Sequence, residues 1–286
     1  MNRLEEINFK HNCLRDLLHQ HQADGLWLRR TRNLAWFTAG ADASIPTDSE
    51  TGAYSILVTP EKRVVYTTNI EATRLRAEDA LQDLGFEYAE CPWYHDHAPD
   101  MPHLLTDDNT IEVEIQHLRW VLTAGEQARL RALGRDAAAA LDEAIRAARP
   151  GDTEFQLAAR LDAACRARGG LAVVNLIGTD ERISQFRHPL PTMKRLDKYA
   201  MIVVCMRRGG LIVSGTRLAY FGRLPADLQA KAQKVACIDA AAMVASQPGR
   251  TLGDAFSDIL VAYHDQGETD QWKLHHQGGL AGYIAR

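Results

Sequence analysis

The sequence has no apolar run of the ~20 residues that a membrane-spanning helix needs, and its first residues lack the apolar core of a signal peptide. It also lacks a strong charge of either sign. The net charge is only −4, which argues against a general nucleic-acid or membrane-surface role. The five cysteines are odd in number and form no Cys-x-x-Cys pair, which favours neither a disulfide framework nor a zinc knuckle. These absences predict a protein of the reducing cytoplasm.

The chain otherwise has the composition of an ordinary globular protein. It has 286 residues, of which 46% are hydrophobic and 24% are charged, enough for one large or two medium domains. Over residues 1–118 helical and strand patterns alternate, which predicts one self-contained α/β domain. We expect helices over residues 3–22 and about 70–84, strands over residues 26–28, 53–59, 63–68 and 87–91, and a loop over residues 96–109.

An internal repeat marks the second region. An Ala-rich helix predicted over residues 127–149 ends in Pro-Gly-Asp-Thr and is followed by a helix over residues 154–168. About a hundred residues later a helix over residues 226–247 ends in Pro-Gly-Arg-Thr, and a helix over residues 252–265 follows. In both copies Pro-Gly stops the first helix and a Thr can cap the next. Such a repeat predicts two similar α/β halves about a pseudo-twofold axis.

The stretch from Asp180 to Gly222 carries the most specific pattern. His188 precedes Pro189 and Pro191, which hold its backbone extended. Two runs rich in β-branched and aromatic residues, 199–206 and 211–221, are joined by Gly209-Gly210, which supplies the positive φ of a tight hairpin. The stretch therefore predicts a histidine-bearing loop that leads into a β-hairpin closed by Thr216-Arg217.

The order of histidine loop, hairpin and Thr-Arg resembles the catalytic half of the pita-bread hydrolases, such as prolidase, Xaa-Pro aminopeptidase and creatinase. Residues 32–38 and 69–75 resemble stretches of the N-terminal domain of creatinase and prolidase. The resemblance implies an α/β (α+β) fold with an N-terminal domain at 1–118 and a C-terminally incomplete pita-bread domain at 119–286.

Metal-dependent members of this family carry an Asp on each hairpin strand. Here the second position falls on Ser214 and the first falls within Val203 to Cys205, where no carboxylate stands. We therefore expect no dinuclear metal site and no cofactor. His275 and His276 remain able to bind a stray zinc or nickel ion, although a hydrogen-bonded role for His276 is an equal alternative.

The family also implies later strands that carry two glutamates. Those strands would need about fifty further residues after Arg286. We expect either that the chain is truncated relative to its relatives or that another chain completes the sheet. Because members with two domains commonly dimerise and a half-sheet would leave an open edge, the resemblance also implies a homodimer.

The repeat predicts a site between the His188 loop, the hairpin and the segment from His275 to Gly282, because it places corresponding parts of the two halves face to face across the pseudo-twofold axis. His188 and His276 are its candidate catalytic residues, although His188 has the alternative of an ordinary loop histidine. Cys205 is either a nucleophile beside two arginines or a small buried hydrophobe. The candidate substrate-binding residues are Ser214, Arg217, His275, Gly278 and Gly279.

Arg217 would pair with a carboxylate of the protein or of a substrate. Without an opposing carboxylate the pocket would be cationic and would prefer an anionic ligand. The predicted function is a metal-free, peptidase-like hydrolase that acts on a C–N bond of a short peptide or amidine. The alternative is a non-catalytic binding or oligomerisation module, and no nucleic-acid or membrane partner is expected.

Overall fold

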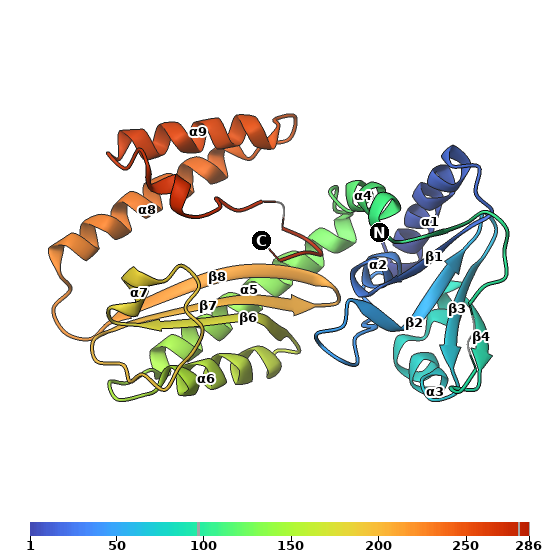
Figure 1. The fold of residues 1–286 in the computed structure, drawn as a ribbon, viewed down its shortest axis with the longest axis horizontal. Coiled ribbons are helices and arrows are strands. Elements are labelled where there is room, and N and C mark those ends of the chain that lie inside the picture. Colours follow the sequence, from blue (N-terminus) through green and yellow to red (C-terminus); the bar gives the residue numbers. More distant parts are fainter. Residues whose placement is uncertain (96–97, 280, 286) are drawn as a thin grey trace.

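The computed structural model describes residues 1–95, 98–279 and 281–285, and it arranges them around two β-sheets (Figure 1). A five-stranded sheet lies in the N-terminal region and a three-stranded sheet in the C-terminal region. One hydrophobic core extends through both regions, from Ile7 in the first helix to Tyr283 near the end of the chain. None of the described helices is long and apolar enough to cross a membrane.

The N-terminal sheet has the strand order β4-β3-β2-β1-β5. The pairs β1–β2 and β2–β3 are antiparallel, whereas β3–β4 and β1–β5 are parallel. The predicted strands and the first helix are confirmed, and each of their ends lies within two residues of the predicted position. The elements are α1 (Arg3–Gln20), β1 (Gly25–Arg30), α2 (Thr31–Phe37), β2 (Thr51–Val58), β3 (Arg63–Thr68), α3 (Ala72–Arg74), β4 (Glu87–Cys91), β5 (Leu104–Thr106) and α4 (Asn109–Leu118).

Two N-terminal predictions are wrong in part. The helix expected over residues 70–84 is divided into α3, a π-helical turn (Leu75–Asp79) and a 3₁₀ turn (Leu81–Leu84). Ala80 breaks it between the two turns, because its left-handed φ of 49° cannot continue a right-handed helix. The loop expected over residues 96–109 contains β5, which pairs with β1. Residues 96 and 97 of that loop lie outside the described residues.

The C-terminal sheet has the strand order β6-β7-β8, with both pairs antiparallel. The helices α5 and α6 cover one face, α5 against β7 and β8 and α6 against β6 and β7 (Figure 1). The hairpin and all four helices of the repeat are confirmed. The elements are α5 (Ala124–Ala147), α6 (Glu154–Arg166), β6 (Leu171–Thr179), α7 (Arg182–Gln185), β7 (Tyr199–Arg208), β8 (Leu211–Tyr220), α8 (Ala226–Ala245), α9 (Leu252–Asp265) and a final 3₁₀ turn (Gln271–Leu274).

Local signals explain where the repeat's helices begin. Thr153 caps α6 by accepting a hydrogen bond from the Gln156 N–H, and Thr251 caps α9 from the Asp254 N–H, both within a reciprocal capping box. The pair α8–α9 lies on the side of the three-stranded sheet opposite α5 and α6 (Figure 1). The helix pairs are thus present as predicted, while the pseudo-twofold relation between them stays a prediction.

A buried charge cluster joins the two regions. Lys10 of α1 is fully buried and donates to Glu6 at 2.6 Å, to Glu126 of α5 at 2.7 Å and to the Trp36 carbonyl at 2.7 Å. The hydroxyl of Tyr283 also donates to Glu126, at 2.6 Å. Each polar group of this cluster therefore has a partner, which is the condition under which a buried charge is tolerated.

The hairpin tip contacts the N-terminal region. Gly209 and Gly210 have positive φ values of 55° and 78°, as the two-residue turn requires. A Cβ at Gly209 would lie 3.3 Å from the Gly40 carbonyl oxygen, and one at Gly210 would overlap Ala35. Glycine at these positions therefore serves both the turn and the close approach of the two regions.

Candidate functional site

The loop that carries His188 is held on strand β6. The Ile177 N–H donates to the Pro189 carbonyl at 3.0 Å, and a Cβ at Gly178 would lie 3.0 Å from the Pro189 ring. Because glycine leaves room for this close packing, the proline-rich loop lies directly against the strand. The His188 side chain itself is exposed to solvent.

Glu154, the first residue of α6, anchors both ends of this loop. It is fully buried, and one of its oxygens accepts hydrogen bonds from Thr179 and from Arg182 Nε at 3.0 Å. Its other oxygen accepts the N–H of Thr192 at 2.9 Å and the hydroxyl of the same residue at 2.6 Å. Sequence reasoning missed this residue, whose only signal was an acidic side chain directly after a helix cap.

Asp180 stabilises the entry to β7. Its carboxylate accepts backbone N–H bonds from Asp197, Lys198 and Tyr199 at 2.8 to 2.9 Å. Burial tends to raise the pKa of Asp180, but these three bonds outweigh it and hold the pKa below its ordinary value. The residue also adopts a left-handed φ of 52°, a conformation that Asp tolerates better than most residues.

The second segment of the site follows α9. Gln277 fixes its path, because its side-chain amide donates to the carbonyls of Trp272 at 3.2 Å and His275 at 2.7 Å. The hydroxyl of Tyr263 in α9 donates to the amide oxygen of Gln277 at 2.8 Å. His275 is therefore carried on a backbone that its neighbours hold in place.

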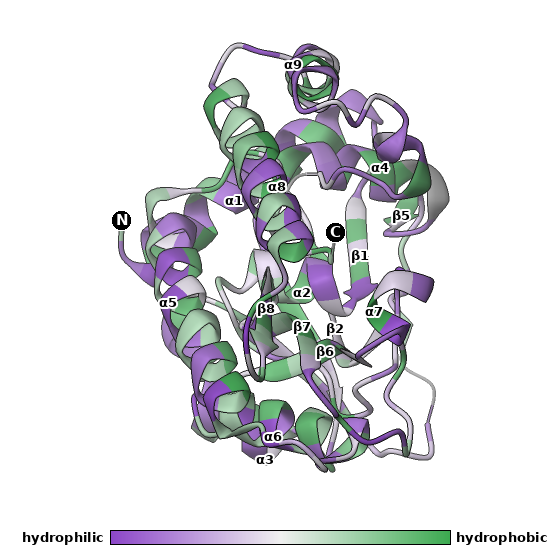
Figure 2. Ribbon diagram, turned by 90° about the vertical axis from the view of Figure 1, so that its left-hand side faces the viewer, coloured by the Kyte–Doolittle hydropathy of each residue, from purple (hydrophilic) through white to green (hydrophobic). Residues whose placement is uncertain are grey.

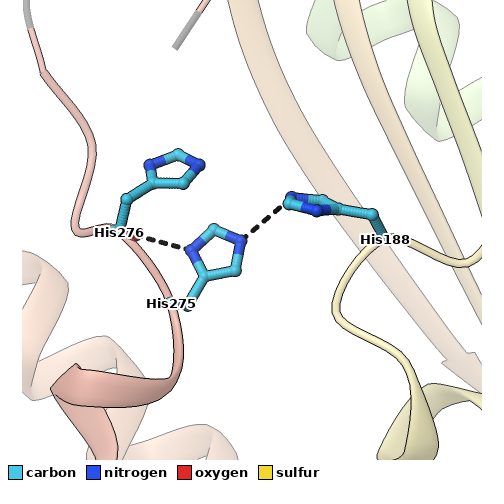
Figure 3. Close-up of side chains that lie close together, drawn as sticks. All are labelled: His188, His275 and His276. Atoms are coloured by element: carbon cyan, nitrogen blue, oxygen red, sulfur yellow. Dashed lines mark hydrogen bonds between the residues drawn. The ribbon is translucent and has the colours of Figure 1, made fainter.

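These two segments bring three histidines together (Figure 3). The Nε2 atoms of His188 and His275 lie 3.1 Å apart, although the residues are 87 positions apart in sequence. The ring of His276 lies 4.2 Å from that of His275 and 6.3 Å from that of His188, between centroids. One ring nitrogen from each of the three histidines lies within 4.8 Å of the other two, close enough for the group to bind a metal ion.

The hydrogen bonds decide which nitrogens carry protons. His275 Nδ1 lies 2.6 Å from the His276 carbonyl oxygen, and since a carbonyl only accepts, Nδ1 must carry the proton. The Nε2 of a neutral His275 therefore presents its lone pair, and His188 Nε2 donates to it. The pair is an oriented imidazole dyad rather than two separate loop histidines.

A shallow hollow of about 360 Å³ adjoins the dyad. Phe256 and Trp272 form an edge-to-face pair in its wall, with ring centroids 5.5 Å apart. The other lining residues are Lys273, Leu274, His275, His276 and Gln277. The hollow thus combines an apolar aromatic wall with imidazole groups, which suits a small ligand with an apolar part.

The structure pairs Cys205 with Ser214 in register on β7 and β8. The Cys205 Sγ lies 3.1 Å from the Ser214 Oγ, and Cys205 is buried. Ser214 occupies the second strand position where the resemblance implies a carboxylate, and Cys205 lies within the run 203–205 that contains the first. A thiol and a hydroxyl do not fit a pair of hard divalent ions, which need bridging carboxylates.

Arg217 corrects one expectation. It lies an odd number of residues from Ser214 on β8, so the two side chains point to opposite faces. Its Nε donates to Asp142 of α5 at 2.7 Å, on the helix-covered face. The prediction that Arg217 pairs with a carboxylate of the protein is confirmed. The separate expectation of a cationic pocket counted this arginine as having no opposing carboxylate, and that part is wrong.

Gly278 and Gly279 are exposed, and Gly278 has a left-handed φ of 101°. Nothing lies within 4 Å of a Cβ built at Gly278, so its backbone conformation rather than crowding favours glycine there. Residue 280, within the segment expected to line the site, lies outside the described residues. Ligand contacts of Ser214, Gly278 and Gly279 stay predictions.

Known structures share this arrangement of elements. Prolidase from Pyrococcus furiosus matches 94% of this chain and 82% of its own chain, with a TM-score of 0.73 and 16% identity. Proline aminopeptidase P II from Yersinia pestis matches 99% and 82%, with a TM-score of 0.71 and 14% identity. Dipeptidase PepE from Mycobacterium ulcerans matches 99% and 82%, with a TM-score of 0.69 and 17% identity.

The chain has the prolidase fold. This confirms the mixed α/β architecture that the histidine loop, hairpin and Thr-Arg predicted. No protein-family model matches the sequence, and no curated protein sequence matches it. The likeness is therefore one of fold, and the domain boundary at residue 118 and the roles of the site residues stay predictions.

Proposed function

We propose that the protein is a peptidase-like hydrolase that cleaves a C–N bond of a short peptide or amidine without a dinuclear metal site. The observation that carries the proposal is the 3.1 Å contact between His188 Nε2 and His275 Nε2 in a chain with the prolidase fold. Imidazole exchanges protons near neutral pH, and a second group that orients it is the usual arrangement for acid–base catalysis.

The hydrogen bonds define each role. His188 Nε2 donates to His275, so His188 Nδ1 takes a proton from the attacking water as the water oxygen bonds to the substrate carbon. The resulting imidazolium returns that proton to the leaving nitrogen as the C–N bond breaks. His275 orients His188 through its fixed Nε2 lone pair, and His276, beside the pair, is the second group proposed to exchange a proton.

The hollow beside the dyad supports a short ligand. Its Phe256 and Trp272 wall can pack against an apolar side chain or a pyrrolidine ring, and Lys273 supplies a positive charge at its edge. An Xaa-Pro dipeptide combines such a ring with a free carboxylate. It is therefore the first substrate to test.

The experiment is a panel assay with Xaa-Pro peptides, creatine and related amidines, in chelator and with added Mn²⁺ or Co²⁺. We expect turnover in chelator, lowered roughly 10²- to 10⁴-fold by His188→Ala or His275→Ala. His264→Ala is the matched control, because His264 is a highly exposed histidine of α9 outside the cluster. Equal activity in all three variants would rule out the proposed roles.

The competing function is a non-catalytic binding module. The Cys205–Ser214 pair favours it, because a neutral pair at these positions leaves the fold without the carboxylates that its metal-dependent relatives are expected to use. A module of this kind would bind members of the same panel and raise the melting temperature, but it would show no turnover under any metal condition.

A further inference from the structure

We propose that His188, His275 and His276 form a binding site for a single late transition-metal ion, Zn²⁺, Ni²⁺ or Cu²⁺. The site differs from a dinuclear carboxylate site in its ligands, its metal preference and its stoichiometry. It requires only that the three imidazoles meet, and so it does not rest on the proposed hydrolase activity.

The spacing of the first two nitrogens fits one ion. Two nitrogens bound to Zn²⁺ at ~2.0–2.1 Å and at a tetrahedral angle lie ~3.3 Å apart. The Nε2 atoms of His188 and His275 lie 3.1 Å apart. An ion can therefore take the place of the proton between the two rings, with a shift of only a few tenths of an ångström, when neutral His188 adopts the tautomer that carries its single proton on Nδ1 instead of Nε2.

The orientation of His275 is that of a metal ligand. Its Nδ1–H donates to the His276 carbonyl at 2.6 Å, which leaves the Nε2 lone pair directed at His188. Metal-binding histidines characteristically make such a bond through their other nitrogen, because it fixes the tautomer and the ring plane. The chain thus already contains the outer contact that a zinc-bound imidazole uses.

His276 supplies the third nitrogen. Its ligand atom lies within 4.8 Å of those of both other histidines, and its side chain is exposed. Closing the remaining distance requires a change of its side-chain rotamer, which an exposed side chain can make without moving the core. Three imidazoles would leave the fourth position of a tetrahedral ion to a water molecule.

The ligand set determines which ions bind. Imidazole suits Zn²⁺, Ni²⁺ and Cu²⁺, whereas Mg²⁺, Ca²⁺ and Mn²⁺ prefer carboxylate oxygens. No carboxylate belongs to the group within the described residues. Lys273 is a charged residue of the adjoining hollow, and its ammonium group donates to Asp270 at 2.6 Å, which directs it to that carboxylate rather than to the histidines.

The backbone around the site is held before any ion arrives. Gln277 and Tyr263 fix the segment that carries His275 and His276, while the Ile177–Pro189 bond fixes the loop that carries His188. Binding therefore costs little ordering of the main chain. An ion would crosslink two segments that are 87 residues apart, which should stabilise the fold.

The test uses the tag-free chain of 286 residues, treated with chelator, and titrates Zn²⁺ and Mn²⁺ by calorimetry near neutral pH. We expect one equivalent of Zn²⁺ to bind with micromolar or tighter affinity and Mn²⁺ to give no saturable binding. Co²⁺ should give the intense visible absorption of a four-coordinate site, which reports geometry independently of activity.

Substitution of each histidine tests whether it is a ligand of the bound Zn²⁺. His188→Gln, His275→Gln and His276→Gln should each weaken Zn²⁺ binding at least about tenfold, while His264→Gln leaves it unchanged. Circular dichroism confirms that each variant is folded, and Ala at the same position replaces any Gln variant that is not. The proposal is overturned if Zn²⁺ binds only at millimolar concentration, if Mn²⁺ binds equally, or if the three variants bind like the parent.

The result is separable from the proposed hydrolysis. An ion on these nitrogens removes the lone pairs that acid–base catalysis needs, so Zn²⁺ should lower any activity measured in chelator. Metal binding without turnover supports the metal site alone, and turnover without metal binding supports the hydrolase alone.

Discussion

The Sγ of Cys205 on β7 lies 3.1 Å from the Oγ of Ser214 on β8, so a thiol and a hydroxyl face each other across the hairpin. In this register the two side chains share one face of the strands, opposite α5 and α6. The face that could present two carboxylates to metal ions presents a neutral pair instead.

The first prediction follows from this pair. After dialysis against chelator and reloading with Mn²⁺ or Co²⁺, the protein should retain fewer than two equivalents, because hard ions lack bridging carboxylates here. Elemental analysis measures the content. Two equivalents of Mn or Co per chain would show that ligands outside this pair build a dinuclear site.

The second prediction concerns the buried lysine. Lys10→Met should lower the free energy of unfolding by about 3–5 kcal/mol, because it leaves Glu6 and Glu126 buried without their shared cation. Burial tends to raise the pKa of Glu6, but Arg129 and Lys10 outweigh it and keep the pKa lowered. Denaturant unfolding provides the measurement.

The matched control for Lys10 is Lys62→Met. Lys62 pairs with Glu87 on the surface, with both side chains more than half exposed, and such a pair contributes at most about 1 kcal/mol. Equal effects of the two substitutions would mean that the cluster has no special role in stability.

The third prediction is a pH dependence at Asp180. Because its folded-state pKa lies below the unfolded value, its stabilisation is present above the unfolded pKa, near ~3.9, and is lost as pH falls through the folded pKa. Asp180→Asn keeps the side-chain shape but not the charge. We expect it to cost about 1–3 kcal/mol near neutral pH, since the carboxylate accepts three backbone N–H bonds.

The same Asp180 variant tests whether the stabilisation by the carboxylate falls or rises as the pH is lowered. Unfolding curves recorded from about pH 7 to about pH 2 should converge for the parent and Asp180→Asn as the parent carboxylate becomes protonated. A difference that grows toward low pH would contradict the lowered pKa.

The fourth prediction is self-association through α8. Val235, Met243 and Val244 are 64%, 68% and 69% exposed, and Figure 2 shows apolar stretches along this helix. We expect light scattering at micromolar concentration to give at least a dimer of the 31.8 kDa chain. Val235→Lys combined with Met243→Lys should shift it to monomer by placing like charges in the contact.

The control for this surface is Val121→Lys. Val121 is 81% exposed but lies between α4 and α5, outside α8, so its substitution should leave the dimer intact. A clean monomer of the parent protein, or equal dissociation by both changes, would contradict an interface on α8.

The sequence predicted the fold where short-range signals were decisive. Gly209-Gly210 identified the hairpin because only glycine adopts two successive positive φ values readily, and the Thr after each Pro-Gly identified the helix starts. The left-handed Ala80 carries no such signal, so the broken helix near it could not be foreseen. Strand β6 is a largely apolar run interrupted by Asn175, and such a pattern does not separate a strand from a buried helix.

The sequence predicted that the histidines lie near one another, but it did not predict the residues that hold them in place. The repeat placed the His188 loop and the His275 segment opposite each other, and the contact between them follows from tertiary packing rather than from spacing. The sequence grouped Arg217 with Ser214, but strand alternation places residues three apart on opposite faces, and Arg217 lies on the helix-covered face. Glu154 and Gln277 hold the two segments through bonds to backbone groups, and such bonds leave no trace in residue order.

The Lys10 cluster also sets an order of events during synthesis. Lys10 and Glu6 leave the ribosome more than a hundred residues before Glu126 and well before Tyr283, which donates to the same carboxylate. Until α5 has emerged, α1 must keep its lysine in water or hold an incomplete ion pair under the first sheet. The N-terminal region therefore reaches its final packing only when the later helix arrives, and its maturation on the ribosome depends on a segment outside its own sheet.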